Sequence, residues 1–391
     1  MIEEISTFRQ QATAFIAGHY PRRSHVDGSS SMAVIPERLE EVERAELPEA
    51  IGWRRATFDA GFGWIDGPAQ YGGRDLPVEY AEAFRDVERG FAVPDEGYTR
   101  FSVGILCPTL LAHATAELRH KYLRSLRRAD RVSCQLFSEP DAGSDLASVR
   151  TRAVRDGDRW RVSGQKVWTS GAHYSDIGML LARTEPGSRR NAGLSVFLIE
   201  MDQPGVEVRP IRQLTGGQSF SEVFLDEAVV PLDHIVGEVH DGWQVITTTL
   251  MHERAVIGSD GAVDLALVPR LVGLARQHGC WDDPVVREAV ADIYVRAQSN
   301  ALMTLDFLDR ADDGLPGPEM SLSKLLLTDN LQRISEVAQR VLGESFAVDS
   351  GDDGFGWSQL ALTLPGLRIG GGTDEVLRTI VAQKVLGLPR S

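Results

Sequence analysis

The segment GWQVITTTLMHERAVIG (242–258) carries an acidic residue in a position where it could do chemistry. At about 100° per residue, Ile246 and Leu250 belong to one apolar stripe of a helix, and Glu253 lies within that stripe. A carboxylate on an apolar face loses hydration, which costs free energy unless the group is paired or used. Two interpretations stay open here. Glu253 forms a structural ion pair with a neighbour such as Arg254, or it is a general base that removes a proton from a bound substrate.

The segment CQLFSEPDAGSDLAS (134–148) is a β-like start that runs into a turn of small residues. Small residues allow the backbone to approach a large ligand, and Ser144 and the turn amides can donate hydrogen bonds to phosphate or hydroxyl oxygens. An ordinary capped loop has the same composition, and it is the simpler interpretation of this segment alone.

The segment QKVWTSGAHYSD (165–176) places an aromatic ring beside hydroxyl groups. Trp168 offers a flat wall on which a planar heterocycle such as a flavin could stack, and Thr169 or Ser170 could donate a hydrogen bond to it. The alternative is that Trp168 is part of the core of a sheet.

The closing segment LRIGGGTDEVLRTIVAQKVLGLPRS (367–391) has three consecutive glycines, at 370–372, before an amphipathic helix. Backbone amides at the start of a helix favour an anion or another polar ligand. The alternative is a flexible loop in which Thr373 or Asp374 caps the helix.

The elements that must position these segments follow from the hydrophobic period. A length of 391 residues is more than one domain usually needs. Residues 1–130 have a helical period, and 238–391 contain long amphipathic helices typical of a bundle. Short β-type runs about ten residues apart fill 131–237, with a hairpin turn at Asp156-Gly157. We therefore expect an α+β chain with an N-terminal helical domain, a middle antiparallel sheet, barrel or sandwich, and a C-terminal helical bundle.

Charge and cysteine content exclude several classes of function. Lys+Arg is 41 against Asp+Glu 56, a net charge of −15 that repels nucleic-acid phosphates. The three cysteines are scattered without a CxxC pair, so neither a metal site nor a disulfide framework is expected. The N-terminus lacks the layout of a signal peptide, and no run of about 18 apolar residues occurs. We expect a soluble cytoplasmic protein without a membrane span.

In this order and spacing, the four segments resemble those of the acyl-CoA dehydrogenase family along nearly the whole chain. FSEPDAGSD, KVWTSG, LMHER and the closing GGT-x-E…VLGLPR fall where that family carries them. PIRQLTGGQSFSEVFLDE (210–227) and PAQYGG (68–73) match further family segments. The family's order of helical domain, β-domain and four-helix bundle agrees with the expected elements.

The resemblance implies a flavoenzyme that oxidises the Cα–Cβ bond of an acyl-CoA to a trans-2-enoyl-CoA. FAD would lie between the β-domain and the bundle and would pass electrons to an electron-transfer flavoprotein. The protein would be a homo-oligomer (dimer or tetramer) or a heterotetramer with a related subunit.

Carried over residue by residue, the resemblance also implies the contacts of the cofactor and the thioester. Trp168 would flank the isoalloxazine, and Ser170, at the family's Thr position, would reach flavin N5. The full set of cofactor contacts in these segments would be Leu136, Phe137, Ser138, Gly143, Ser144, Trp168, Thr169, Ser170, Thr373 and Glu375. The substrate would contact Ser144, Arg254, Gly371 and Gly372.

One departure from the family pattern concerns the base. Many members carry a catalytic Glu just before the Gly-Thr of the last segment, but this chain has Gly371 there. Relatives that act on branched or long acyl chains take the base from the Glu of an LxxER segment, and Glu253 occupies that position. The resemblance therefore implies that Glu253 removes the α-proton while hydride leaves Cβ for flavin N5. A backbone amide near Gly371 and a ribityl hydroxyl of FAD would polarise the thioester carbonyl.

A second departure concerns the FAD contacts that the family makes across subunits. Where the family has an Arg-x-x-Phe-Gly element, this chain has Ala275, followed by Arg276. The family's Gln-x-x-Gly-Gly element reads RVLGE here, with Arg340 and Gly343. Either Arg276 and Arg340 complete the FAD site, or the partner subunit is a different chain, as in α2β2 relatives.

Three alternative functions remain open from the sequence. A dehydrogenase of this kind could act on an acyl-carrier-protein thioester. A flavin monooxygenase on the same fold would need no base, and Glu253 argues against it. A poorly active subunit of a heteromeric dehydrogenase is favoured by the altered bundle elements and opposed by the intact segments. The acyl group is not encoded in any of these motifs, although Gly371 favours a group bulkier than a short straight chain.

Overall fold

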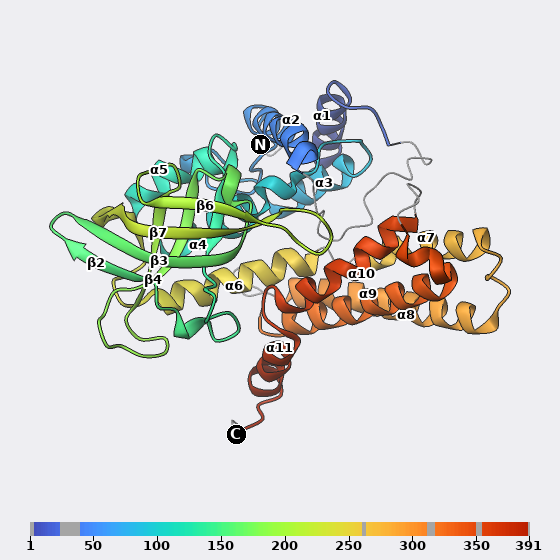
Figure 1. Ribbon diagram of the computed structural model, residues 1–391. Helices are drawn as coiled ribbons and strands as arrows, with labels where there is room; N and C mark the ends of the chain where they lie inside the picture. Colours follow the sequence, from blue (N-terminus) through green and yellow to red (C-terminus); the bar gives the residue numbers. More distant parts are fainter. Residues whose placement is uncertain (1–3, 24–39, 260–262, 311–316, 349–353, 390–391) are drawn as a thin grey trace. The chain divides into compact units, whose positions relative to one another are not determined.

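The computed structural model describes residues 4–23, 40–259, 263–310, 317–348 and 354–389 (Figure 1). The chain forms two compact units. The first comprises 1–30, 38–213 and 217–246, and the second comprises 31–37, 214–216 and 247–391. The first unit holds both the N-terminal helices and the sheet, so the domain boundaries expected at 130 and 237 stay a prediction.

The N-terminal part of the first unit is helical, as expected. Its α-helices are α1 (Ile5–Ala17), α2 (Glu40–Asp59), α3 (Val78–Glu88), α4 (Cys107–His113) and α5 (Ala116–Arg127). The short 3-10 helices η1 (Ala69–Tyr71) and η2 (Glu96–Thr99) and the π-helix η3 (Phe101–Leu106) lie between α2 and α4. The Thr115 hydroxyl accepts a hydrogen bond from the Leu118 amide and so fixes the start of α5. An aromatic cluster that includes Phe8, Trp53 and Phe62 forms the core of this part.

The sheet of the first unit has eight strands. They are β1 (Ser133–Leu136), β2 (Arg152–Asp156), β3 (Arg159–Ser170), β4 (Ile177–Arg183), β5 (Leu194–Glu200), β6 (Val206–Ile211), β7 (Phe220–Pro231) and β8 (Ile235–Val236). The strand order is β6-β7-β3-β2-β4-β5-β8, with β1 paired to β4. The hairpin at Asp156-Gly157 is confirmed, because Asp156 pairs with Arg159 and Gly157 has a φ of 62°.

The expected antiparallel β-domain is confirmed, since most strand pairings in the sheet are antiparallel, but two pairings are parallel. Strand β1 runs parallel to β4, and β2 meets β4 in parallel at Arg152 and Arg183, whereas the other pairings are antiparallel. Strand β4 is buried at its first six positions, which suits a central strand covered on both faces. The long ladder between β3 and β7 carries the segment around Trp168.

The second unit is a helical bundle, which confirms the expected class of structure (Figure 1). Its helices are α6 (Gly242–Ser259), whose first residues belong to the first unit, α7 (Val263–Gln277), α8 (Pro284–Asp309), α9 (Met320–Leu342), α10 (Gly354–Ile369) and α11 (Asp374–Ile380). The 3-10 helix η7 (Gly343–Ala347) follows α9, and the π-helix η8 (Val381–Val385) follows α11. Helix α9 contacts α7, α8, α10 and α11, so it is the central helix of the bundle. Among the described helices, none combines the length and apolarity needed to cross a membrane.

Candidate active site

A buried ion pair joins two of the segments in the first unit. Glu139 of FSEPDAGSD accepts a hydrogen bond from Lys166 of KVWTSG, with 2.8 Å between Oε1 and Nζ. The same carboxylate accepts from the backbone amides of Arg150 (2.6 Å) and Thr151 (2.9 Å). Lys166 also donates to the Phe137 carbonyl at 2.9 Å. Four hydrogen bonds therefore fix the shape of the 137–151 loop, and two of them attach it to Lys166 on β3.

The electrostatics of this pair agree with a structural role. Burial lowers the pKa of Lys166 to about 8, and the charge of Glu139 acts against that shift. Burial acts to raise the pKa of Glu139, but the Lys166 charge and the amide hydrogen bonds hold it below its ordinary value. Sequence analysis missed both residues, because each is an ordinary charged residue within its own segment.

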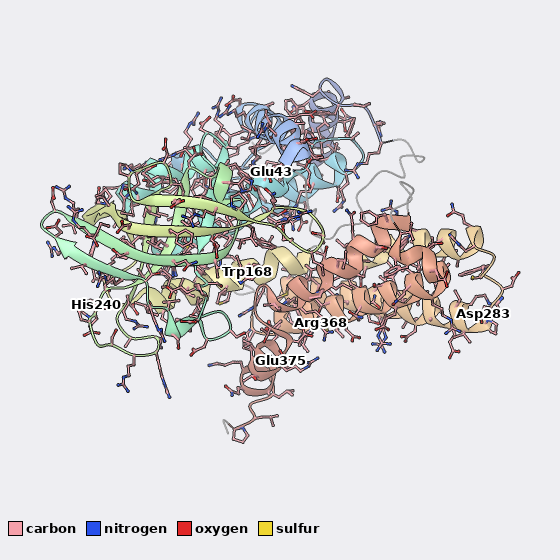
Figure 2. The ribbon with its side chains drawn as sticks, in the orientation of Figure 1. Glu43, Trp168, His240, Asp283, Arg368 and Glu375 are labelled. Carbon is pink, nitrogen blue, oxygen red and sulfur yellow. The ribbon has the colours of Figure 1, made fainter. Side chains whose placement is uncertain are left out.

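Trp168 lies on a β-bulge and is exposed. Lys166 pairs with Val223 and Thr169 pairs with Ser221, so β3 contains one more residue than β7 between these two positions. Trp168 has a φ of 61° and its side chain is 59% exposed, with its ring packed edge-on against Phe220 (Figure 2). The alternative of Trp168 as sheet core is therefore wrong.

Only one of the two neighbouring hydroxyls shares the face of Trp168. Ser170 is exposed and lies two residues further along the strand, whereas Thr169 is buried. The Thr169 hydroxyl and the Ser221 hydroxyl opposite it are both buried, and neither has a hydrogen-bond partner among the described residues. Of the two hydroxyls expected beside the ring, only that of Ser170 is accessible on the face of Trp168. The Thr169 side chain is buried, so Thr169 could contact a ligand on that face only through its backbone.

The other predicted contacts of the first unit divide into buried and exposed residues. Leu136 belongs to the sheet core, and Phe137 is also buried. Ser138 is half-buried and its carbonyl accepts from the Val167 amide at 2.9 Å, which ties the loop to the bulge. Gly143 and Ser144 are exposed on the turn. Ser138 and Ser144 therefore have side chains that a ligand could reach, while Leu136 supports the strand.

In the second unit, Glu253 is half-buried on α6, next to Arg254. Burial lowers the pKa of Arg254, and the charge of Glu253 acts against that shift. The Arg254 Nε is buried and has no hydrogen-bond partner among the described residues. The two side chains are thus electrostatically linked, which leaves both interpretations of Glu253 open.

The glycine loop (residues 370–372) lies against Arg254. Gly371 and Gly372 have φ values of 65° and 104°, a left-handed conformation that glycine adopts at little cost. A Cβ placed on Gly372 would lie 4.0 Å from Arg254 Nη2. The Gly372 carbonyl accepts a hydrogen bond of 2.5 Å from Lys324 on α9. The structure thus brings together Arg254 and Gly372 from the predicted set, and it adds Lys324, which sequence analysis missed.

The residues after the glycine loop begin α11. The Thr373 hydroxyl accepts from the Val376 amide, which confirms its expected role as a helix cap. Asp374 is buried and accepts from Arg368 on α10 at 2.8 and 2.6 Å. Glu375 is exposed (Figure 2). Arg368 and Asp374 therefore hold the first turn of α11 to α10, and the Glu375 side chain is accessible.

Arg276 and Arg340 lie at the other end of α9 from Lys324. Arg276 ends α7 and stacks over Trp281, with 5.5 Å from its Cζ to the ring centroid. Arg340 lies 3.9 Å from Asp283, measured between Nη2 and Oδ2, and Gly343 follows α9 with a φ of 56°. Both arginines therefore flank the connection between α7 and α8. At 1.5 Å per residue, Arg340 is about 24 Å along α9 from Lys324.

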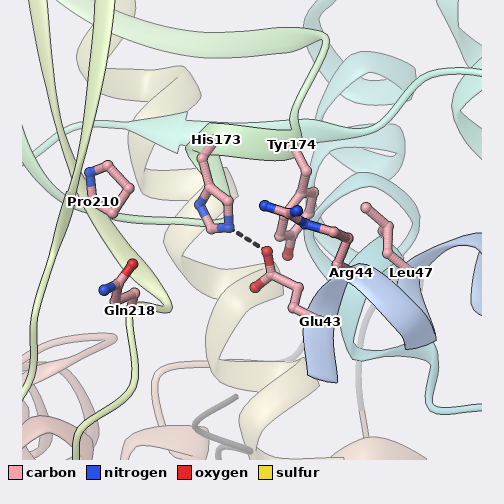
Figure 3. A pocket seen from close by; sticks show the side chains of 7 residues that line it. All are labelled: Glu43, Arg44, Leu47, His173, Tyr174, Pro210 and Gln218. Carbon is pink, nitrogen blue, oxygen red and sulfur yellow. Dashed lines mark hydrogen bonds and ion pairs between the residues drawn. The ribbon is translucent and has the colours of Figure 1, made fainter. Parts of the chain in front are cut away.

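A pocket of 380 Å³ lies in the first unit, between α2 and the sheet (Figure 3). It is lined by Glu43, Arg44, Leu47, His173, Tyr174, Pro210 and Gln218. His173 hydrogen-bonds Glu43 across it. One lining residue, His173, is three residues after Ser170 in the sequence. None of the predicted site residues lines this pocket.

Comparisons with known proteins cover both units of the chain. Three family models match consecutive parts of the chain: acyl-CoA dehydrogenase N-terminal domain over 3–130, middle domain over 134–228 and C-terminal domain over 240–386. Acyl-CoA dehydrogenase IpdE1 of Mycobacterium tuberculosis (strain ATCC 25618 / H37Rv) is 38% identical over 349 residues, covering 89% of this chain and 90% of that protein.

Two further matches extend the comparison. Acyl-CoA dehydrogenase FadE34 of the same organism is 35% identical and covers 97% of this chain but 52% of that protein. The solved structure titled "Tcur3481-Tcur3483 steroid ACAD" has a TM-score of 0.80 and 28% identity, and covers 100% of this chain and 99% of that chain. Together these matches show that the chain belongs to the acyl-CoA dehydrogenase family and is an enzyme that dehydrogenates an acyl thioester.

Proposed function

We propose that this enzyme uses FAD to oxidise the Cα–Cβ bond of a bulky acyl-CoA to a trans-2-enoyl thioester, with Glu253 as the base. The observation that carries the proposal is the position of Glu253 on α6. It is half-buried next to Arg254, which lies against the glycine loop in which Gly371 replaces the usual base. A carboxylate in this place supplies the proton acceptor that the loop lacks.

The first unit provides residues that suit a flavin. Trp168 presents an exposed ring on a β-bulge, and Ser170 follows on the same face. A planar isoalloxazine can stack on such a ring and take a hydrogen bond from the hydroxyl. When bound, FAD would supply the acceptor for the hydride that leaves Cβ. A solved structure titled "PigA with FAD and proline" shares this fold at 19% identity and a TM-score of 0.74.

The chain's own residues would carry out the proton chemistry. Glu253 would remove the α-proton, and the positive charge of Arg254 beside it would interact favourably with the carboxylate. A backbone amide near Gly371 would donate to the thioester carbonyl, which makes the α-proton more acidic. Half-burial of Glu253 limits competing contact with water.

A bulky acyl group is the substrate class that these residues favour. Gly371 places no side chain where relatives carry a glutamate, so the loop leaves more room for the acyl chain. The solved relative at 28% identity is titled a steroid ACAD, which supports a ring-containing acyl group here. A structure titled "Crystal Structure of the Prolyl Acyl Carrier Protein Oxidase AnaB" is 19% identical and shares the fold, so a carrier-protein thioester is the second candidate substrate.

We further infer that the chain assembles with a second copy or with a related subunit. Val295, Leu302 and Leu305 lie on one face of α8 and are 60%, 66% and 59% exposed. Arg340 lies about 24 Å along α9 from Lys324, a separation that suits contact with a neighbouring subunit's cofactor. The titles of two related structures name complexes, Tcur3481-Tcur3483 and ChsE4-ChsE5. An electron-transfer flavoprotein would accept the electrons.

The test of this function is anaerobic bleaching of the flavin in the purified protein. The substrate panel contains short straight-chain, long straight-chain and steroid side-chain CoA esters, and the matching carrier-protein thioesters. We expect the bulky CoA ester to bleach the flavin at a rate about tenfold above the short-chain ester. A colourless protein would instead support the non-catalytic subunit. Oxygen-dependent hydroxylation without anaerobic bleaching would support a monooxygenase.

A further inference from the structure

Lys324 on α9 is a fully buried lysine whose ammonium contacts the backbone of a loop. Its side chain is 1% exposed, and Nζ donates to the Gly372 carbonyl at 2.5 Å. Burying an ammonium group costs free energy unless strong partners compensate for lost hydration. A carbonyl that accepts from a charged donor forms one of the stronger hydrogen bonds in proteins. Lys324 is therefore a firm attachment point for the glycine loop.

The glycine loop depends on such an attachment. Three consecutive glycines have no side chains to pack, and they lose more conformational entropy on ordering than other residues. Gly371 and Gly372 both have left-handed backbone conformations. Gly372 is enclosed on its other side, because a Cβ there would lie 3.2 Å from Leu377 Cδ2 and 4.0 Å from Arg254 Nη2. The loop is thus held between Lys324 on α9, α11 and the Arg254 side chain of α6.

The charge of Lys324 also acts on the acidic residues around the loop. The charged groups that influence it are Asp374 on α11 and Glu253 and Arg254 on α6. Burial lowers the pKa of Lys324 to about 8, while Asp374 and Glu253 act against that shift. At neutral pH the side chain is thus mainly a cation, hydrogen-bonded to the glycine loop and within range of the charge of Glu253.

We propose that Lys324 is a positioning residue: its hydrogen bond to the Gly372 carbonyl fixes the glycine loop to α9, beside Arg254 of α6, and so sets the distance between Glu253 and the thioester. The inference rests on the proposed function of Glu253. A loop amide that binds the thioester carbonyl must be held in place, because a displacement of about 1 Å can cost 100-fold in rate.

The test compares Lys324→Met and Lys324→Arg in the flavin-loaded enzyme. The matched control is Ser323→Ala, which removes the buried hydrogen bond from Thr304 to Ser323 (2.8 Å) on the adjacent residue of α9. Hydrogen exchange of the amides in 366–377 reports on the loop without turnover. Steady-state kinetics with the best thioester of the panel report on positioning.

In Lys324→Met we expect the amide hydrogens of the loop to exchange about tenfold faster than in the wild type, because one charge-assisted hydrogen bond is lost. The kcat of Lys324→Met should fall about 30-fold, with KM changed less than about threefold. Lys324→Arg keeps a charged donor and should recover most of both properties. Ser323→Ala should change neither property, even if it lowers the melting temperature. If Lys324→Met does not fold, Lys324→Gln replaces it, with faster loop exchange and lower kcat expected.

Two results would overturn the proposal. One is loop exchange and kcat in Lys324→Met that match the wild type. The other is faster loop exchange without a change in kcat, because the loop would then be anchored for stability alone. Failure of the proposed function is recognised separately: the wild-type enzyme would not oxidise any thioester, or Glu253→Gln would remain active.

Discussion

Each unit of the chain buries a lysine whose pKa is lowered to about 8 by its surroundings, but the two lysines meet different partners. Lys166 in the first unit contacts Glu139, whose carboxylate also accepts from two backbone amides. Lys324 in the second unit contacts a backbone carbonyl, and Glu253 acts on it through charge. The hydrogen bonds of Glu139 hold the 137–151 loop in its conformation. The second carboxylate, Glu253, is next to Arg254, which lies against the glycine loop, and we propose that it takes up a proton from the substrate.

This difference teaches that burial of a charge does not by itself indicate catalysis. Glu139 and Glu253 both come from segments that resemble family motifs, and both are removed at least partly from water. The hydrogen bonds of Glu139 explain why it is buried, so its removal should affect folding. Glu253 interacts through charge with Arg254 and Lys324 and holds the position that the family resemblance assigns to the base, so we expect its removal to affect the reaction.

The largest effect on stability is expected from Lys166→Met. This change leaves the Glu139 carboxylate buried without its charged partner, which should lower the free energy of unfolding by about 3–5 kcal/mol. Urea unfolding of the two proteins measures the loss. The control is Arg161→Gln on the same strand, which removes an exposed pair with Asp156 (2.8 Å) and should cost under about 1 kcal/mol. A stable Lys166→Met protein that has lost activity would assign this pair to the chemistry instead.

A smaller effect, on the pH dependence of stability, is expected from a change at Glu88, a partly buried carboxylate on α3. Burial, and next the charge of Glu96, raise its pKa to about 7. The folded state therefore keeps a proton that the unfolded state releases above its ordinary pKa of 4.5, so stability is lost as pH rises from 4.5 through 7.

Glu88→Gln should remove this part of the pH dependence. Melting temperatures at pH 5 and pH 8 measure it, and we expect the wild type to lose a few degrees more than the variant between these values. Equal losses in the two proteins would show that Glu88 is ionised in the fold at neutral pH. The Glu88 hydrogen bond from Trp53 Nε1 (3.1 Å) can be kept by the amide oxygen of glutamine.

The smallest effect is expected from Arg340→Gln at the far end of α9. Its side chain is 57% exposed, so the cost in stability should be under about 0.5 kcal/mol. If Arg340 contacts a neighbouring subunit's FAD, the fraction of flavin retained after dilution should fall severalfold while the oligomeric state is kept. The ratio of flavin to protein absorbance and size-exclusion chromatography measure the two. Unchanged flavin retention would mean that Arg340 does not contact the cofactor.

Local patterns predicted much of the fold. The hydrophobic period and the turn residues of each segment predict the hairpin at Asp156-Gly157, the succession of short strands and the long helices α8 and α9. These signals depend only on residues close together in the sequence. The parallel pairings of β1 and β2 with β4 were not predictable in this way, because a strand's apolar pattern does not specify the direction of its partner.

The candidate site was predictable where one residue type stands out in its own segment. Glu253 interrupts an apolar stripe, and three glycines in succession mark the loop. The pairs that hold these segments were not predictable, because Lys166 meets Glu139 across 27 residues and Lys324 meets Gly372 across 48. Such contacts are set by tertiary packing, and nothing in either segment alone indicates its partner.

The most direct test of the account is the single-turnover rate of Glu253→Gln. Both this variant and the control Asp264→Asn exchange an acid for an amide in the second unit. Asp264 is fully buried and bonded to Asn330 at 2.8 Å. With equal flavin content, we expect Glu253→Gln to reduce flavin by the thioester about 10³-fold more slowly than wild type, with its melting temperature unchanged. Asp264→Asn should keep its rate per folded protein. A Glu253→Gln rate within about threefold of wild type would contradict the assignment of Glu253 as the base.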